Sequence, residues 1–256
     1  MDIRQHNEIA WDKEVERGNK WTIAVSSKTV EKARNGEYKL LLTPFKEVPK
    51  EWIGNVENKN VLCLASGGGQ QGPIFAALKA NVVVFDNSSN QLDKDKMVAN
   101  RENLDIKLEQ GDMRDLSRFE NESFDLIFHP VSNCFINEVE KVWKECYRVL
   151  KPGGVLISGF VNPIMYIFDL YEWEKHNELV VKNSIPYSDI QQLPPEQLEE
   201  RLDNKETLEF GHSLTSQIGN QIDAGFAITG FYEDKSGDDI IDEHIDVFIA
   251  TKAFKI

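Results

Sequence analysis

The pattern of hydrophobic and polar positions predicts a sheet of largely buried strands that alternate with helices. Short apolar runs bounded by glycine, polar or charged residues are typical of strands buried on both faces. They lie at residues 61–64, 82–85, 106–108, 124–128, 155–160, 226–232 and 245–251. Because helical patterns separate most of these runs, we expect an α/β fold.

Helical periodicity is clearest between the fourth and fifth predicted strands. The apolar residues there recur on one face of a helix, at Val139, Val142, Trp143, Cys146, Tyr147 and Val149. Further helices are predicted at residues 3–16, 28–34, 74–79 and 214–224. Gly225 follows the last of these, where a left-handed helix cap is expected.

A glycine-rich turn follows the first predicted strand. Gly67, Gly68, Gly69 and Gly72 tolerate positive φ and let the main chain approach a ligand without an intervening Cβ. The next helix would point its free N–H groups at that ligand. Asp86 ends the second strand, where its carboxylate can accept hydrogen bonds from two ribose hydroxyls. This arrangement predicts an adenosine site.

The glycine spacing alone does not identify the cofactor. Gly67, Gly69 and Gly72 satisfy G-x-G-x-x-G, and Asp86 lies 19 residues after Gly67, near the spacing of a dinucleotide site. NAD therefore remains an alternative at this point, as does a glycine turn that merely connects a strand to a helix.

Two later motifs help to choose between these interpretations of the glycine turn. The segment GDM lies at residues 111–113, after the third strand, and LKPGG lies at residues 150–154, before the fifth. With these motifs the chain resembles the class I S-adenosylmethionine-dependent methyltransferases, particularly the small-molecule type similar to methyltransferase domain 11. The similarity covers about residues 60–160. It implies a Rossmann-like seven-stranded mixed sheet with helices on both faces and an antiparallel last strand.

The resemblance also implies which residues bind S-adenosylmethionine. Residues 65–69 would wrap the methionine moiety, Asp86 would hold the ribose, and residues 111–113 would meet the adenine. The implied contacts are Ala65, Ser66, Gly67, Gly69, Asp86, Asn87, Gln91, Gly111, Asp112, Met113, His129 and Pro130, with Val131 lining the pocket. Two positions depart from the family pattern. Cys63 stands where an acidic residue is usual, and Ala65 replaces the usual first glycine.

The net charge and the amino-acid composition limit the kinds of molecule that the protein is expected to bind. The formal charge of −14 over 256 residues argues against nucleic acid, because binding a phosphate backbone depends on clustered Lys and Arg. The three cysteines lie in apolar contexts and are expected to be buried free thiols. We expect a cytoplasmic protein that does not engage membranes, since neither a leader pattern nor a membrane-length apolar run is present.

Segments outside the core are expected to build the acceptor site. We divide the chain into an N-terminal helical cap (1–60), a cofactor-binding core (61–161), an inserted substrate lid (162–213) and the C-terminal part of the sheet (214–256). The insertion is too long for a simple connection, and ligands of open α/β folds bind at this end of the sheet. The acceptor contacts we expect are Trp21, Asn162, Tyr166 and Phe168, with Trp11 a further candidate for the lid. Packing on the core is the alternative for these aromatic residues.

The predicted function is methyl transfer from S-adenosylmethionine to a small-molecule acceptor. Methyl transfer needs a base only if the nucleophile must lose a proton. His129 is the candidate base, because it ends the fourth strand, although such a histidine can simply bond neighbouring backbone. His176 and His212 are weaker candidates, and no metal site is expected. A nicotinamide-dependent oxidoreductase and a non-catalytic S-adenosylmethionine-binding protein are the alternatives.

Overall fold

The central feature of the molecule is a seven-stranded mixed sheet in the order β3-β2-β1-β4-β5-β9-β8. The computed structural model describes residues 1–237 and 239–256. The strands are β1 (Asn60–Leu64), β2 (Asn81–Asp86), β3 (Ile106–Gln110), β4 (Phe124–His129), β5 (Leu150–Val161), β8 (Phe226–Asp234) and β9 (Phe248–Lys255). Strands β1 to β5 pair in parallel, whereas β9 is antiparallel to both β5 and β8. The predicted fold class is therefore confirmed.

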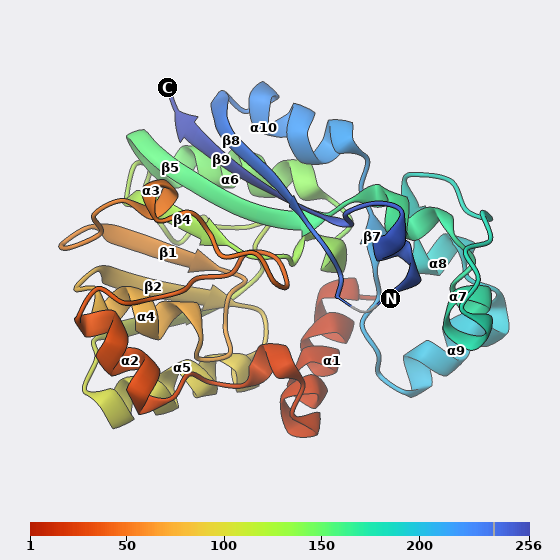
Figure 1. Ribbon diagram of the computed structural model, residues 1–256, viewed down its shortest axis with the longest axis horizontal. Helices are drawn as coiled ribbons and strands as arrows, with labels where there is room; N and C mark the ends of the chain where they lie inside the picture. Colours follow the sequence, from red (N-terminus) through yellow and green to blue (C-terminus); the bar gives the residue numbers. More distant parts are fainter. Residues whose placement is uncertain (238) are drawn as a thin grey trace.

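Helices cover both faces of the sheet (Figure 1). On one face lie α2 (Ser27–Arg34), α4 (Gln71–Ala77) and α5 (Ser89–Glu102). On the other lie α6 (Val139–Val149) and α10 (Asn220–Asp223), which continues the π-helical segment η4 (Thr215–Gly219). Each face has its own apolar core. Phe75 and Val84 belong to the first core, and the fully buried Trp143 of α6 belongs to the second.

The N-terminal segment places α1 (Ile3–Arg17) beyond the carboxyl ends of the strands and α2 on one face of the sheet (Figure 1). It also contains the short 3-10 helix η1 (Lys20–Thr22) and α3 (Lys50–Ile53). Helix α1 begins at Asp2, whose side chain accepts from the Gln5 N–H, and ends at Gly18, whose φ is +73°. Figure 1 shows α1 beyond the ends of β1 and β2, between the sheet and the lobe that carries α7 to α9.

That lobe is the long insertion after β5. It comprises η3 (Pro163–Ile167), α7 (Leu170–His176), β6 (Tyr187–Ser188), α8 (Asp189–Gln192), α9 (Pro195–Asp203) and β7 (Phe210–Gly211). Strands β6 and β7 form a separate antiparallel pair. The lobe lies at the right of Figure 1, at the same end of the sheet as α1.

The structure differs from the sequence expectations at three elements. Strand β5 begins at Leu150, so the LKPGG segment expected before the strand is an irregularity within it, where Gly153 has a φ of +74°. The last strand was expected from Ile245 but begins at Phe248. The acidic stretch before it, whose charge alone is typical of a solvated loop, contains η5 (Ile240–Glu243) with a buried Ile241. Residue 238 of that stretch lies outside the described residues.

The three cysteines are free and buried, as predicted. Among the described residues, we find no helix with the length and apolar character needed to cross a membrane.

Candidate active site

A cavity of about 730 Å³ opens at the carboxyl ends of β1, β2 and β4. Strands β1 and β4 are adjacent, so this is the point where the strand order reverses, the usual ligand site of open α/β sheets. The glycine turn, the end of β2, the loop after β4, the N-terminal segment and the insertion all contribute to its wall. Cap and insertion thus meet the core at one site.

The turn after β1 is held in a conformation suited to a ligand. The Ala65 N–H donates to the Phe85 carbonyl at 2.7 Å, and Ala65 has a φ of +47°, in the region that favours glycine. The next glycine leaves no room for a side chain. A Cβ at Gly67 would lie 2.7 Å from the Cβ of Gln91. The absence of a side chain therefore keeps this part of the turn next to α5.

Asp86 is positioned by backbone N–H groups. Its Oδ2 accepts from Gly67 at 2.8 Å, and its Oδ1 accepts from Ser88 at 2.9 Å. Burial raises the pKa of the Asp86 carboxyl, while these backbone hydrogen bonds oppose that rise. Each carboxylate oxygen has more than one lone pair, so the residue retains acceptors for ligand hydroxyls.

A second carboxylate supports the glycine turn from α5. Asp95 is fully buried, and its Oδ2 accepts from the Gly69 N–H at 2.9 Å. Burial raises the pKa of Asp95 to about 8. Its Oδ1 has no hydrogen-bond partner among the described residues. Sequence reasoning missed Asp95, although the absence of an acid at Cys63 was a signal that the turn needed a carboxylate from elsewhere.

The polar groups predicted around the nucleoside have different partners. The Gln91 Oε1 atom is buried without a partner among the described residues, and Gln91 lines the cavity. Asn87 is bonded to Arg4 of α1 through both side-chain atoms, at 3.2 and 3.0 Å. Asp112 forms a bidentate pair with Arg114, whose Nη2 lies 2.6 Å from Oδ2. The Asp112 carboxylate, expected from the sequence to meet an adenine amino group, is therefore already paired with Arg114.

His129 is fully buried, and both ring nitrogens are occupied. Nδ1 lies 2.9 Å from the Leu64 carbonyl and Nε2 lies 2.8 Å from the Asn133 Oδ1. Burial lowers the pKa of the imidazole. The ring does not belong to the cavity wall. These contacts fit a role in tying β1, β4 and the following loop together, which is the structural alternative recognised from the sequence. His212 also bonds backbone, because its Nε2 lies 3.0 Å from the Asn133 carbonyl and 2.9 Å from the Ile136 carbonyl.

Hydrogen bonds hold the N-terminal segment against the glycine turn and the start of α5. The Asp12 Oδ1 of α1 accepts from the Ser88 hydroxyl at 2.6 Å and the Asn90 N–H at 3.1 Å. The Val25 N–H donates to the Gly69 carbonyl, and the Gln70 side chain donates to the carbonyls of Lys20 and Ile23. The cap is therefore bonded to the glycine turn as well as to α5.

The insertion contributes a hydrogen-bonded pair at the opposite wall. The Tyr166 hydroxyl donates to the Glu209 Oε2 at 2.8 Å, and both residues line the cavity. Asn7 of α1 connects this wall to the cap, because its side chain donates to the carbonyls of Phe135 and Leu208 and accepts from the Leu208 N–H. Sequence reasoning did not identify Glu209 or Asn7.

The cavity brings together most, but not all, of the predicted site residues. Those in its wall are Ala65, Ser66, Gly67, Asp86, Asn87, Gln91, Gly111, Asp112, Met113, Pro130, Val131, Trp11, Trp21 and Tyr166. Gly69, His129, Asn162 and Phe168 are not part of the wall. Asn162 caps η3 by accepting from the Ile164 N–H, and Phe168 packs edge-on against Trp173 at 5.7 Å.

Comparison with known proteins identifies the family. A family model described as a methyltransferase domain matches residues 62–158. A Bacillus subtilis (strain 168) protein, named as the uncharacterized methyltransferase YbaJ, is 53% identical over 251 residues, 98% of each chain. The chain belongs to the methyltransferase family. This membership favours methyl transfer over the nicotinamide alternative, and the protein is an S-adenosylmethionine-dependent methyltransferase.

Other methyltransferases share the fold or part of the sequence. An S-adenosylmethionine-dependent methyltransferase from Mesorhizobium loti has a TM-score of 0.59 at 16% identity, covering 80% of this chain and 94% of its own. Geranyl diphosphate C-methyltransferase from Streptomyces coelicolor, solved with S-adenosylhomocysteine, also scores 0.59, at 12% identity over 100% of this chain and 99% of its own. A sterol 24-C-methyltransferase of Aspergillus fumigatus is 34% identical over 124 residues, 47% of this chain and 29% of that protein.

The methyltransferase site fits its cofactor. The close approach that Gly67 permits, the ordered Asp86 carboxylate and the unpartnered Gln91 Oε1 together form a polar cradle at one end of the cavity. A cavity of about 730 Å³ is within the usual range for small-molecule sites. The site therefore has the acceptors, the close backbone approach and the volume that an adenosyl ligand needs.

Proposed function

We propose that this methyltransferase methylates a small molecule with a substantial apolar part. The observation that supports this acceptor class is the composition of the wall away from the glycine turn. That part of the wall is mainly apolar and includes Leu41, Phe45, Val161, Met165 and Phe248. Apolar surface transferred from water into such a pocket contributes about 25 cal/mol per Å² to binding.

We also propose a separate role for each segment of the chain. Residues 61–161 would bind the cofactor, while residues 1–60 would cover it and residues 162–213 would select the acceptor. Residues 214–256 would complete the sheet. Ala65, Ser66 and Gly67 would hold the methionine end, Asp86 the ribose, and Gln91 with residues 111–113 the adenine. The hydrogen bonds of Asp12 and Asn7 support the covering role of the cap.

For methyl transfer, the protein mainly has to position the acceptor and exclude water from the site. When bound, S-adenosylmethionine supplies a methyl group activated by its sulfonium. The protein's part is to hold the acceptor nucleophile in line with that methyl group and to keep water from the site. Trp21 and Phe135, one from the cap and one from the loop after β4, are large apolar residues of the wall that would displace water.

Transfer of a radioactive methyl group tests the acceptor class. The purified protein is incubated with S-adenosylmethionine labelled in the methyl group and with panels of apolar phenols, amines and carboxylic acids. DNA, tRNA and denatured protein serve as macromolecular comparators. We expect label in the small-molecule fraction. Label transferred only to a macromolecule would contradict the proposal, and calorimetry with S-adenosylhomocysteine establishes separately that the cofactor site is intact.

A further inference from the structure

The insertion places a carboxylate and a phenol in the cavity, away from the glycine turn. Glu209 immediately precedes β7, and its Oε2 accepts the Tyr166 hydroxyl at 2.8 Å. Both residues line the cavity. For the other oxygen, Oε1, no hydrogen-bond partner occurs in the part of the chain that the structure describes. One acceptor of a partly buried carboxylate is thus left for a ligand.

Hydrogen bonds and ring stacking within the insertion hold this pair in place. The Asp189 Oδ2 accepts from the Glu209 N–H at 2.8 Å, and its Oδ1 accepts from the Tyr187 hydroxyl at 2.8 Å. The Tyr187 ring stacks on Tyr166 with centroids 5.3 Å apart and an interplanar angle of 20°. A Cβ at Gly211 would lie 2.7 Å from the Tyr166 ring, so only glycine permits this close packing. Glu209 is therefore oriented from several directions.

The charges around the pair leave Glu209 without a direct cationic partner. Arg201 lies 3.5 Å from the Asp189 Oδ2 and balances that carboxylate. The described residues include no ion pair to Glu209 itself. Burial, and then the charge of Asp189, raise the pKa of Glu209, while the Tyr166 hydrogen bond lowers it. A carboxyl group in such surroundings is a stronger proton acceptor once ionised than an ordinary surface carboxylate.

We propose that Glu209 binds an O–H or N–H group of the methyl acceptor and takes up its proton during transfer. This inference rests on the proposed small-molecule function. Methylation forms a bond from the acceptor oxygen or nitrogen to the methyl carbon and breaks the carbon–sulfur bond, whose electron pair stays on sulfur. One proton leaves the nucleophile, and Glu209 accepts it. Tyr166 orients the carboxylate, and the preferred acceptor is an apolar molecule with a protic nucleophile.

Binding of matched probes tests the inference without requiring turnover. Three probes share an apolar body: 2-naphthol, 2-naphthylmethylamine and 2-methylnaphthalene. Each is titrated by ligand-observed NMR into protein saturated with S-adenosylhomocysteine. Because a charged acceptor binds a hydrogen-bond donor more strongly than a neutral one, we expect at least one protic probe to bind about tenfold or more tightly than 2-methylnaphthalene. The naphthol presents a neutral O–H group, whereas the amine is an ammonium group at neutral pH, so the two probes separate a hydrogen-bonded ligand from an ion-paired one.

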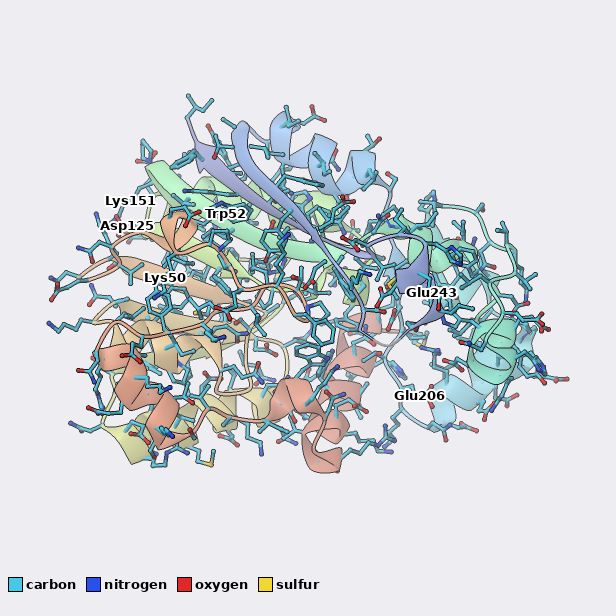
Figure 2. All side chains as sticks on the ribbon, in the orientation of Figure 1. Lys50, Trp52, Asp125, Lys151, Glu206 and Glu243 are labelled. Carbon is cyan, nitrogen blue, oxygen red and sulfur yellow. The ribbon has the colours of Figure 1, made fainter. Side chains whose placement is uncertain are left out.

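Glu209→Gln is the decisive variant. Its amide oxygen can still accept from Tyr166, but the charged acceptor facing the cavity is replaced by an N–H group, so the preference for protic probes should fall about tenfold. Glu206→Gln is the matched control, because Glu206 is a neighbouring acidic residue of the same lobe outside the cavity wall (Figure 2). It should retain the preference. Affinity for S-adenosylhomocysteine should be the same in all three proteins.

Tyr166→Phe keeps the inference testable if Glu209→Gln does not fold. This variant leaves both Glu209 oxygens open, so the preference for protic probes should persist or increase. A preference that survives Glu209→Gln, that is absent from the unmodified protein, or that is lost in Tyr166→Phe would overturn the role of Glu209 while leaving the apolar site standing. If none of the probes binds, the proposed apolar acceptor site itself fails, and this inference fails with it.

Discussion

The Asp12 carboxylate accepts a hydrogen bond from the Ser88 hydroxyl at 2.6 Å, joining residues 76 positions apart. The same Oδ1 atom accepts from the Asn90 N–H. Ser88 and Asn90 begin the helix that follows Asp86, and Asp12 belongs to α1. The cap is therefore attached next to the proposed ribose site, and we expect release of the cofactor to require this attachment to loosen.

Replacing Asp12 tests whether the cap retains the cofactor. Asp12→Ala removes hydrogen bonds to a carboxylate, which contribute about 1.5–3 kcal/mol. We expect S-adenosylhomocysteine to dissociate about tenfold faster, as measured by stopped-flow competition. Glu16→Gln changes an exposed acid of the same helix and should leave the rate unchanged. An unchanged rate in Asp12→Ala would mean that α1 does not control release.

Asp86→Ala tests the position of the ribose. Loss of hydrogen bonds to a charged acceptor should weaken S-adenosylhomocysteine binding by about 1.5–3 kcal/mol, as measured by calorimetry. The control is Asp125→Asn, because Asp125 pairs with Lys151 at 2.8 Å and both lie at the other end of the sheet (Figure 2). Equal affinity in the Asp86 variant and the unmodified protein would show that the ribose binds elsewhere.

The buried Asp95 predicts a particular dependence of stability on pH. Its pKa is about 8 in the folded chain, against an ordinary value of 3.8, so the folded chain holds this proton more tightly than the unfolded chain. The free energy of unfolding should therefore fall between about pH 4 and 8, with a contribution from this group of about 1.4 kcal/mol per pH unit.

Asp95→Asn should make that dependence shallower. An asparagine oxygen can still accept from the Gly69 N–H, and the amide has no proton to lose. The variant should gain stability relative to the unmodified protein at pH 8 but not at pH 4, as measured by urea denaturation at several pH values. Asp93→Asn, on the exposed face of α5, is the control. Parallel curves for Asp95→Asn and the unmodified protein would contradict the prediction.

The left-handed conformation of Ala65 predicts a stabilising glycine. A φ of +47° is costly for alanine but not for glycine, while glycine loses more backbone freedom on folding. We expect Ala65→Gly to raise the free energy of unfolding by about 0.5–1 kcal/mol. Ala76→Gly, within α4, should lower it by about 1 kcal/mol. Destabilisation of both variants would show that the Ala65 Cβ contributes packing that offsets its strain.

Local patterns in the sequence determined the elements and the cofactor end of the site. Seven apolar runs became the seven strands of the sheet, because burial on both faces demands continuous apolar segments. The glycine turn and Asp86 were identifiable because they lie close to the ends of predicted strands: Gly67 belongs to the turn after β1, and Asp86 ends the neighbouring strand β2. Boundaries were less predictable where a strand contains an irregularity, as β5 does at Gly153.

Which distant side chains meet at the cavity depends on how the chain folds and could not be predicted from its sequence patterns. Asp95 reaches the glycine turn from α5, Asn7 joins the cap to the insertion, and Glu209 meets Tyr166 across 43 positions. The hydrogen bonds of both His129 ring nitrogens could not be predicted from the sequence either, because the partners come from β1 and from the loop after β4. Hydropathy and spacing report on neighbours along the chain, whereas hydrogen-bond partners and burial depend on how separate segments pack. For that reason the sequence predicted where the cofactor would bind, whereas the packed structure brought together the groups that we propose receive the acceptor.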